Sequence, residues 1–300
     1  MQLRRAASRF GYSLVEILVV IGILGTLFAL LLPAVQRVRE SASRTRCANN
    51  LRQIGVAFHC HHDSYQCFPS NGGGTDSPIP DINGAPFIPM TEWLVGQHVV
   101  FIWSAGDPGK HVSKQTGSWA FSILPYVEEA AVHSARDWTK SVKGYICPSR
   151  RAAVSLPAFN DANGKYYGGG WAWGKTDYAV YAGFIQSRPS CSPMSVVTDG
   201  ASQTILVGEK AMDPDNYETG TWFYDEPFFL GNSSGVRRLG FAVVRDKRGH
   251  DFVDNWGSAH PAGAHFAFVD GSVHVIRHGT IGQVMKALLT HNEGEIVGSY

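Results

Sequence analysis

Glu16 is the residue whose surroundings most restrict its chemistry. It is the one formal charge in the apolar stretch 14–35. A carboxylate inside a bilayer costs a few kcal/mol even on insertion-based scales, so it should have a partner or a function. A free α-amine at Tyr12 would lie one helical turn away, close enough for an ion pair. The simpler alternative is that Glu16 lies near the membrane edge and snorkels.

A free amine at Tyr12 requires cleavage after Gly11. A basic segment with Arg4, Arg5 and Arg9 comes first, then Gly11, and then the apolar run. An ordinary secretory signal has a shorter apolar core and ends in a small-residue cleavage site. Glycine has no side chain and lets a protease approach the backbone closely. This order predicts a cleavage that removes the leader and keeps the hydrophobic segment.

The run 10–16 resembles the class III signal of type IV pilins and pseudopilins. In that pattern Gly is usually followed by Phe, then by Thr or Ser, Leu, a hydrophobic residue and Glu; here Tyr12 stands where Phe is usual. The resemblance implies that a prepilin peptidase cuts between Gly11 and Tyr12 and methylates the new amine. It also implies that Glu16 reaches the amine of a neighbouring subunit and guides filament assembly.

One long helix is expected to carry these residues. Residues 12–35 suffice for a single membrane span, because a hydrocarbon core of ~30 Å needs ~20 apolar residues. The positive-inside rule keeps the leader 1–11 in the cytoplasm. Pro33 is expected to kink the helix or to mark its exit from lipid. Apolar residues then repeat every three or four positions over 36–62, which predicts a continuing helix with one buried face.

The remaining residues, 63–300, are predicted to form an extracytoplasmic α+β head. Its basis would be an antiparallel β-sheet with long loops, packed against the pilin-like helix 12–62. Apolar residues make up 44% and aromatic residues 12% of the chain, with 33 glycines, which favours a β-rich, loop-rich body. A net charge of +1 offers no electrostatic argument for nucleic acid as a partner. The predicted location is the inner (cytoplasmic) membrane, crossed once.

Within the head, residues 264–276 form the clearest predicted hairpin. Asp270-Gly271 would be a two-residue turn, with Phe268 opposite Val273 and apolar alternation on both sides. Residues 280–290 are predicted to form a helix, and 119–136 a helix broken at Pro125. Residues 157–175, rich in Gly and aromatic residues, resemble an exposed loop suited to ligand or partner contact; the simpler alternative is that their aromatic side chains cover a sheet.

A second resemblance spans nearly the whole chain. Its C-terminal signature is a His, nine residues and Asp-Gly, here His260 and Asp270-Gly271. Further matching segments are 47–55, 119–128, 147–149, 176–178 and 198–209. Together they resemble a large bacterial family known only as domain of unknown function 1559, whose members begin with a pilin-type helix. The family has no agreed biochemical function, so the resemblance implies fold and location rather than activity.

The cysteines permit disulfides, because the predicted head lies outside the cytoplasm. Their number, five, leaves at least one thiol free or paired between chains. Cys60 with Cys67 and Cys47 with Cys147 are equally allowed pairs. The connectivity stays open among Cys47, Cys60, Cys67, Cys147 and Cys191.

Three sets of side chains are candidate metal ligands, each with a simpler structural explanation. They are His59, His62 and Asp63 at a helix end; His260, His265 and His274 around the hairpin; and Asp177, Asp199 and Glu209 as oxygen ligands for calcium. The first set also fits a polar helix end, and the second requires convergence across the hairpin. No EF-hand-like spacing supports calcium in the third set. No metal or cofactor is therefore expected.

The predicted function is non-catalytic. Ser202 lacks a Gly-x-Ser-x-Gly context, and neither a P-loop nor a dinucleotide fingerprint is present. We expect a type IV pilin-like or pseudopilin-like structural or secretion-system component, with prepilin peptidase, membrane lipid and other pilin-like subunits as partners. The alternative is an extracytoplasmic ligand-binding module that uses the anchor without filament assembly and binds through the aromatic loop 166–173.

Overall fold

The computed structural model describes residues 13–75, 78–94, 96 and 98–295. It divides into two compact units, the first ending at Ala42 and the second beginning at Ser43. Gly11 and Tyr12, the residues of the predicted cleavage, lie outside the described residues.

The N-terminal helix, α1 (Leu14–Tyr65), begins with a capping box. The Ser13 hydroxyl accepts the Val15 N–H at 3.4 Å, and the Glu16 carboxylate accepts the Ser13 N–H at 2.8 Å. This reciprocal arrangement satisfies donors that have no partner within the first helical turn. Pro33 lies inside α1 and does not end it. Glu16 therefore has a local structural role in capping the first turn of α1.

The first part of α1 exposes its apolar side chains. Leu14, Leu30 and Val38 are 73%, 75% and 70% exposed. Within the described residues, α1 alone is long and apolar enough to cross a membrane, and none of its most apolar window is buried in the protein. The core helix of a soluble protein would be mostly buried. The exposed apolar surface is therefore consistent with a single-pass anchor or a signal sequence.

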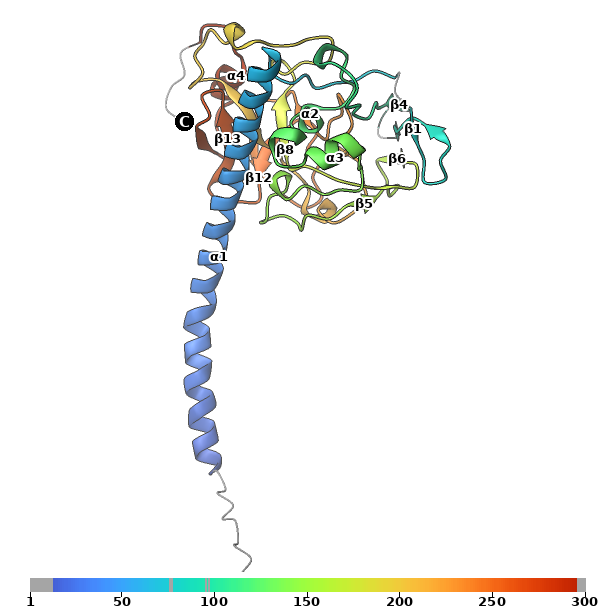
Figure 1. Ribbon diagram of the computed structural model, residues 1–300. Helices are drawn as coiled ribbons and strands as arrows, with labels where there is room; N and C mark the ends of the chain where they lie inside the picture. Colours follow the sequence, from blue (N-terminus) through green and yellow to red (C-terminus); the bar gives the residue numbers. More distant parts are fainter. Residues whose placement is uncertain (1–12, 76–77, 95, 97, 296–300) are drawn as a thin grey trace, which may run out of the picture. The chain divides into compact units, whose positions relative to one another are not determined.

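The later part of α1 belongs to the second unit and packs against its core. Leu51, Ile54 and Phe58 are fully buried, and the Phe58 ring lies 5.4 Å from that of Trp119. This part runs along the head beside β13 (Figure 1), and its Gly55 faces Ala267 of that strand. The predicted continuation beyond residue 36 is confirmed, and the helix ends at Tyr65 rather than His62.

A mixed five-stranded sheet forms the centre of the head. Its strand order is β10 (Arg237–Arg238), β8 (Tyr178–Tyr181), β9 (Ile205–Glu209), β13 (Gly263–Phe268) and β14 (Val273–Arg277). All neighbours are antiparallel except β10 and β8. Ala267 joins the core that α1 covers, whereas Phe266 and Phe268 join a second core with α4 (Gly282–Leu289). The α+β class with a helix packed on a sheet is confirmed.

The hairpin exists, but its predicted register is wrong by one residue. Ala267, not Phe268, lies opposite Val273, and Phe266 lies opposite His274. The reason is the neighbouring segment before β9: Val269 donates its N–H to the carbonyl of Thr204. Val269 is thereby drawn toward that strand, and the connection becomes longer than a two-residue turn. A shift of one residue exchanges the two faces of a strand.

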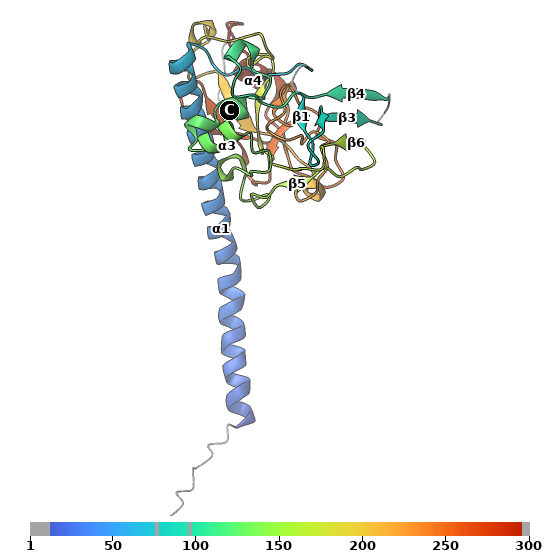
Figure 2. The ribbon, with the colours of Figure 1, turned by 45° about the vertical axis from the view of Figure 1, so that its right-hand side comes forward.

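Smaller sheets surround this centre. Figure 2 shows β4 (Val99–Ile102), β3 (Met90–Trp93) and β6 (Gly164–Tyr167) as a three-stranded sheet on the side of the head away from α1. The two-stranded pairs are β1 (Ile79–Pro80) with β2 (Pro86–Phe87), β5 (Leu156–Pro157) with β7 (Ala172–Trp173), and β11 (Val243–Arg245) with β12 (Trp256–Ser258).

Residues 157–175 do not form an exposed loop throughout, because β6 and β7 lie within them; the alternative, that their aromatic side chains cover a sheet, agrees better with the structure. Tyr166 and Trp173 are buried and lie 6.2 and 6.0 Å from the ring of Trp222. Their aromatic rings fill the core because strand pairing turns them inward, although Tyr167 remains exposed. This segment therefore does not present its aromatic residues together as a ligand surface.

Short helices complete the head. The predicted break at Pro125 is confirmed, since α2 (Trp119–Ser122) and α3 (Ala130–Ala135) are separated by the 3-10 turn Leu124–Tyr126. The other 3-10 turns are Val112–Lys114, Lys143–Tyr145, Met194–Val196 and Pro214–Asn216.

Candidate functional site

Buried side chains from four segments meet in the second unit. Cys47 lies on α1, Cys147 follows the turn Lys143–Tyr145, Glu209 ends β9, and His260 follows β12. The two sulfur atoms are 2.7 Å apart, and His260 Nε2 lies 3.5 Å from both Cys147 Sγ and Glu209 Oε1. Each of these residues is 0% exposed. We call this group the Cys-His-Glu cluster.

Local hydrogen bonds hold the cysteine-bearing segments in place. The Asp177 carboxylate accepts the Cys147 N–H at 2.7 Å. From α1, the Asn50 amide donates to the Ile146 carbonyl at 3.1 Å and to the Tyr178 hydroxyl at 3.2 Å. These bonds attach α1 to the Cys147 segment on one side of the cluster, so both sulfur atoms have defined positions.

Glu209 and His260 form a buried ion pair. Glu209 Oε2 accepts the N–H of His265 at 2.7 Å and contacts its Nδ1 at 2.9 Å. Burial alone would raise the pKa of Glu209, but His260 and His265 outweigh it and hold that pKa well below its usual range. Burial lowers the pKa of His260, yet contacts with Cys147 and Glu209 raise it to about 10. His260 is therefore protonated at neutral pH.

The donor set of the Cys-His-Glu cluster is one that zinc accepts. Its four ligand atoms lie within 4.8 Å of one another, and His265 would orient the Glu209 carboxylate from outside. However, two sulfur atoms bound to one zinc at ~2.3 Å each lie ~3.8 Å apart in tetrahedral geometry. The observed 2.7 Å is much shorter. A metal would require the sulfur atoms to separate and His260 to lose its proton.

Cys147 is also a poor nucleophile. A hydrogen bond with Cys47 and burial both raise the pKa of its thiol. The thiolate is the reactive form of cysteine, and reactive cysteines are partly exposed. Cys147 is 0% exposed. Burial and the raised thiol pKa therefore disfavour Cys147 as a nucleophile.

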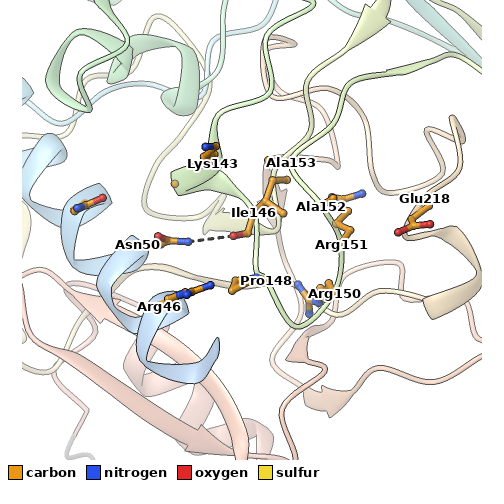
Figure 3. A pocket seen from close by; sticks show the side chains of 12 residues that line it. Arg46, Asn50, Lys143, Ile146, Pro148, Arg150, Arg151, Ala152, Ala153 and Glu218 are labelled. Atoms are coloured by element: carbon orange, nitrogen blue, oxygen red, sulfur yellow. Dashed lines mark hydrogen bonds between the residues drawn. The ribbon is translucent and has the colours of Figure 1, made fainter. Parts of the chain in front are cut away.

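A cavity of about 710 Å³ adjoins the Cys147 segment. Figure 3 shows Arg46 and Asn50 from α1 on one side, and Lys143, Ile146 and Pro148 beside them. Arg150, Arg151, Gln53, Gly144, Ala152, Ala153 and Glu218 complete the lining. Arg46 and Lys143 are exposed. The volume lies within the usual range for small-molecule sites, and the exposed cations favour an anionic ligand.

A buried charge cluster supports the wall of this cavity. Asp225 contacts Arg151 at 2.7 Å, Lys210 at 2.8 Å and Lys175 at 3.6 Å. Burial is the largest influence on both lysines and lowers the pKa of each to about 8. Burial alone would raise the pKa of Asp225, but the three cations hold it far below its usual range. Asp225 is thus the shared counterion of three cations.

The residues of the C-terminal motif lie at two different sites in the head. His260 belongs to the Cys-His-Glu cluster, whereas Asp270 and Gly271 lie in the hairpin connection. The Asp270 carboxylate accepts the Ser272 N–H at 2.8 Å, and Gly271 has φ +83°, which favours glycine. Asp270 and Gly271 thus lie in the hairpin connection, which is longer than the predicted two-residue turn. His260 lies 3.5 Å from Glu209 instead of in the hairpin connection.

Among the described residues, neither candidate histidine set forms a metal-compatible group. His62 Nε2 accepts the Met194 N–H at 3.1 Å. His265 approaches His260, with their rings 5.1 Å apart, whereas His274 pairs with Ser272 and is exposed. The corrected register accounts for this separation, because it places His265 and His274 on opposite faces of the sheet.

The predicted oxygen ligands also have separate partners. Asp177 pairs with Arg151 at 2.6 Å, and Asp199 accepts the N–H groups of Glu293 and Gly294. In the part of the chain that the structure describes, the Cys-His-Glu cluster is the one group of three or more His, Cys, Asp and Glu side chains with metal-compatible spacing.

One disulfide joins Cys67 to Cys191, one of the pairings that the sequence leaves open. Cys67 is therefore not available to Cys60, whereas Cys47 and Cys147 are indeed brought together. Sequence reasoning missed the association of these two cysteines with Glu209 and His260. The available signal was their position, because all four residues fall on segments that carry the family resemblance.

Residues 36–280 match the family model SBP_bac_10, described as a protein of unknown function (DUF1559). No curated protein and no solved structure matches the chain. Since the match covers well over half of the chain, the protein belongs to the DUF1559 family.

Proposed function

We propose that this protein is a membrane-anchored, pilin-like component of the cell envelope that acts without catalysis. The first part of α1 would cross the inner membrane once, with the leader 1–11 in the cytoplasm and the head outside it. The observation that carries the proposal is the exposed apolar surface of α1. The disulfide between Cys67 and Cys191 supports an extracytoplasmic head, because disulfides persist in oxidising compartments.

Maturation by a prepilin peptidase would expose the amine that Glu16 requires. The Glu16 carboxylate reaches back over the first turn of α1 to the N–H of Ser13. A carboxylate directed toward the helix start supports pairing with an amine at residue 12, in the same chain or in a neighbouring subunit. Prepilin peptidase, membrane lipid and other pilin-like subunits are the proposed partners, and nucleic acid is not.

Processing predicts a defined mature N terminus. Intact-mass and peptide analysis of the protein from cell envelopes should find N-methylated Tyr12 as the first residue. Deleting the peptidase gene should restore the full leader. A mature protein that still begins at Met1 would contradict the proposed processing and, with it, the filament mechanism.

Assembly through Glu16 predicts that Glu16→Ala prevents filament formation. We expect at least about a tenfold loss of sheared surface filaments, because the subunit amine loses its counterion. Membrane insertion and processing should persist. Ser13→Ala is the matched control, since it removes the capping hydroxyl and keeps the Glu16 charge. Filaments of normal yield in Glu16→Ala would show that Glu16 does not direct assembly.

The cavity favours a second candidate function, an extracytoplasmic ligand-binding module. Its ligand would be a small anion, held by Arg46 and Lys143 rather than by the aromatic loop 166–173. Calorimetry with acetate, succinate and citrate would test this function. Arg46→Glu should weaken binding at least about tenfold, and Lys247→Glu, outside the cavity lining, should not. Equal affinities in the two variants, or no binding to the unchanged protein, would dismiss the anionic site.

A further inference from the structure

We propose that Cys47 and Cys147 form a second disulfide, which fastens helix α1 to the head. The proposal rests on the sulfur separation and the surroundings of the pair. It also rests on the proposed extracytoplasmic location, because an oxidising compartment must supply the oxidant.

The distance between the two sulfur atoms supports a bond over the alternatives. Carbon atoms in contact are already about 3.5–4.0 Å apart, and sulfur is larger. Sulfur atoms sharing a zinc ion are ~3.8 Å apart, whereas a disulfide bond measures about 2.05 Å. The observed separation is 2.7 Å. A small approach completes the bond, whereas a metal requires a larger separation within a closely packed core.

Glu209 has protein partners without a metal. Its Oε2 accepts the N–H of His265 at 2.7 Å, and its Oε1 lies 3.5 Å from His260 Nε2. Bonding Cys47 to Cys147 leaves both contacts in place. A zinc ion would instead need two thiolates at a fully buried position.

Burial determines when this bond forms. Once the head has folded, Cys47 and Cys147 are 0% exposed and cannot meet an oxidant. Oxidation must therefore precede the final packing of α1. The two thiols lose two protons and two electrons as the Sγ–Sγ bond forms through a mixed disulfide. A disulfide-bearing thiol oxidoreductase accepts them and is reduced to its dithiol.

The consequence is a covalent link at each end of the buried part of α1. Cys47 lies where burial begins on the helix, and Cys67 follows closely after its end at Tyr65. The later end is already linked, because Cys67 is bonded to Cys191. The earlier end, at Cys47, would be linked to Cys147. The chain between these links carries Leu51, Ile54 and Phe58 into the core. Tension on the anchor would then be transmitted to the head through covalent bonds.

Alkylation mapping of the full-length protein tests the proposal. The protein is taken from membranes into detergent, denatured with N-ethylmaleimide without reductant, digested and analysed by mass spectrometry. We expect a linked peptide pair for Cys47–Cys147, a second for Cys67–Cys191, and N-ethylmaleimide on Cys60. Reduction before alkylation should label all five cysteines.

Two results would overturn the proposal and can be told apart. Free Cys47 and Cys147 beside an intact Cys67–Cys191 bond would reject the second disulfide while leaving the extracytoplasmic location in place. Alkylation of every cysteine would reject both the disulfide and the oxidising location. Elemental analysis of the same preparation completes the test, since one zinc ion per chain together with free Cys47 and Cys147 would assign a metal site instead.

Discussion

Asp225→Asn is expected to lower the free energy of unfolding of the head by about 3–5 kcal/mol, the range for breaking a buried ion pair. Asp225 is the shared counterion of Arg151, Lys175 and Lys210, with its closest contact at 2.7 Å. Asparagine preserves the shape and removes the charge, so Lys175 and Lys210 would lose this counterion, whereas Arg151 would keep Asp177 at 2.6 Å. Chemical denaturation of the purified head would measure the loss.

The pH dependence of this variant has a definite sign. The pKa values of Lys175 and Lys210 are lowered to about 8 from the ordinary 10.5. Between about pH 8 and pH 10.5 the unfolded chain therefore binds more protons than the folded protein, and the free energy of unfolding rises with pH. Without Asp225 the lysine pKa values fall further, so the rise should begin at lower pH. The depressed pKa of Asp225 also means that its stabilising effect is lost below about pH 3.8, its ordinary value.

Asp215→Asn is the matched control for this change. The side chain of Asp215 is 57% exposed and lies 3.4 Å from an exposed Arg248. Exposed ion pairs contribute about 0–1 kcal/mol. If Asp225→Asn cost no more than this control, the buried charges would not depend on Asp225.

Glu209→Gln is expected to destabilise the head by about 3 kcal/mol, at the lower end of the range for a broken buried pair. The loss is smaller than for Asp225 because His260 can release its proton when Glu209 loses its charge. In the variant, burial should carry the pKa of His260 below its ordinary 6.5, whereas contacts in the unchanged protein raise it. NMR titration of His260 and denaturation at several pH values would measure both effects.

The difference in unfolding free energy between the unchanged protein and Glu209→Gln should depend on pH in a fixed direction. Glu209, with a depressed pKa, contributes stability above about pH 4.5, its ordinary value. His260, with a raised pKa, contributes fully below pH 6.5 and loses this contribution as pH rises through about 10. The destabilisation should therefore be largest between about pH 4.5 and 6.5. Glu293→Gln, at a side chain 44% exposed, should show no comparable change. An unchanged His260 titration in Glu209→Gln would disprove the ion pair.

Several elements were predictable because their causes are local. The apolar run after residue 13 and the three-to-four periodicity beyond residue 36 indicate a long helix with one buried face, and α1 has both. Pro125 breaks the helical segment where its missing N–H predicts a break. Gly271 adopts a positive φ in the hairpin connection, as its lack of a side chain allows. Each feature depends on a short stretch of chain.

The register, the cysteine pairing and the candidate site depend instead on distant segments. Val269 leaves the expected hairpin register because Thr204 accepts its N–H. The apolar pattern of the hairpin alone does not predict that bond. Cys67 meets Cys191 across a sequence separation of 124 residues. The Cys-His-Glu cluster likewise joins Cys47, Cys147, Glu209 and His260. Residue types show which chemistry such groups can perform, but their meeting depends on how the sheet and α1 pack. The long helix thus follows from the sequence, whereas its attachment to the head follows from the tertiary fold.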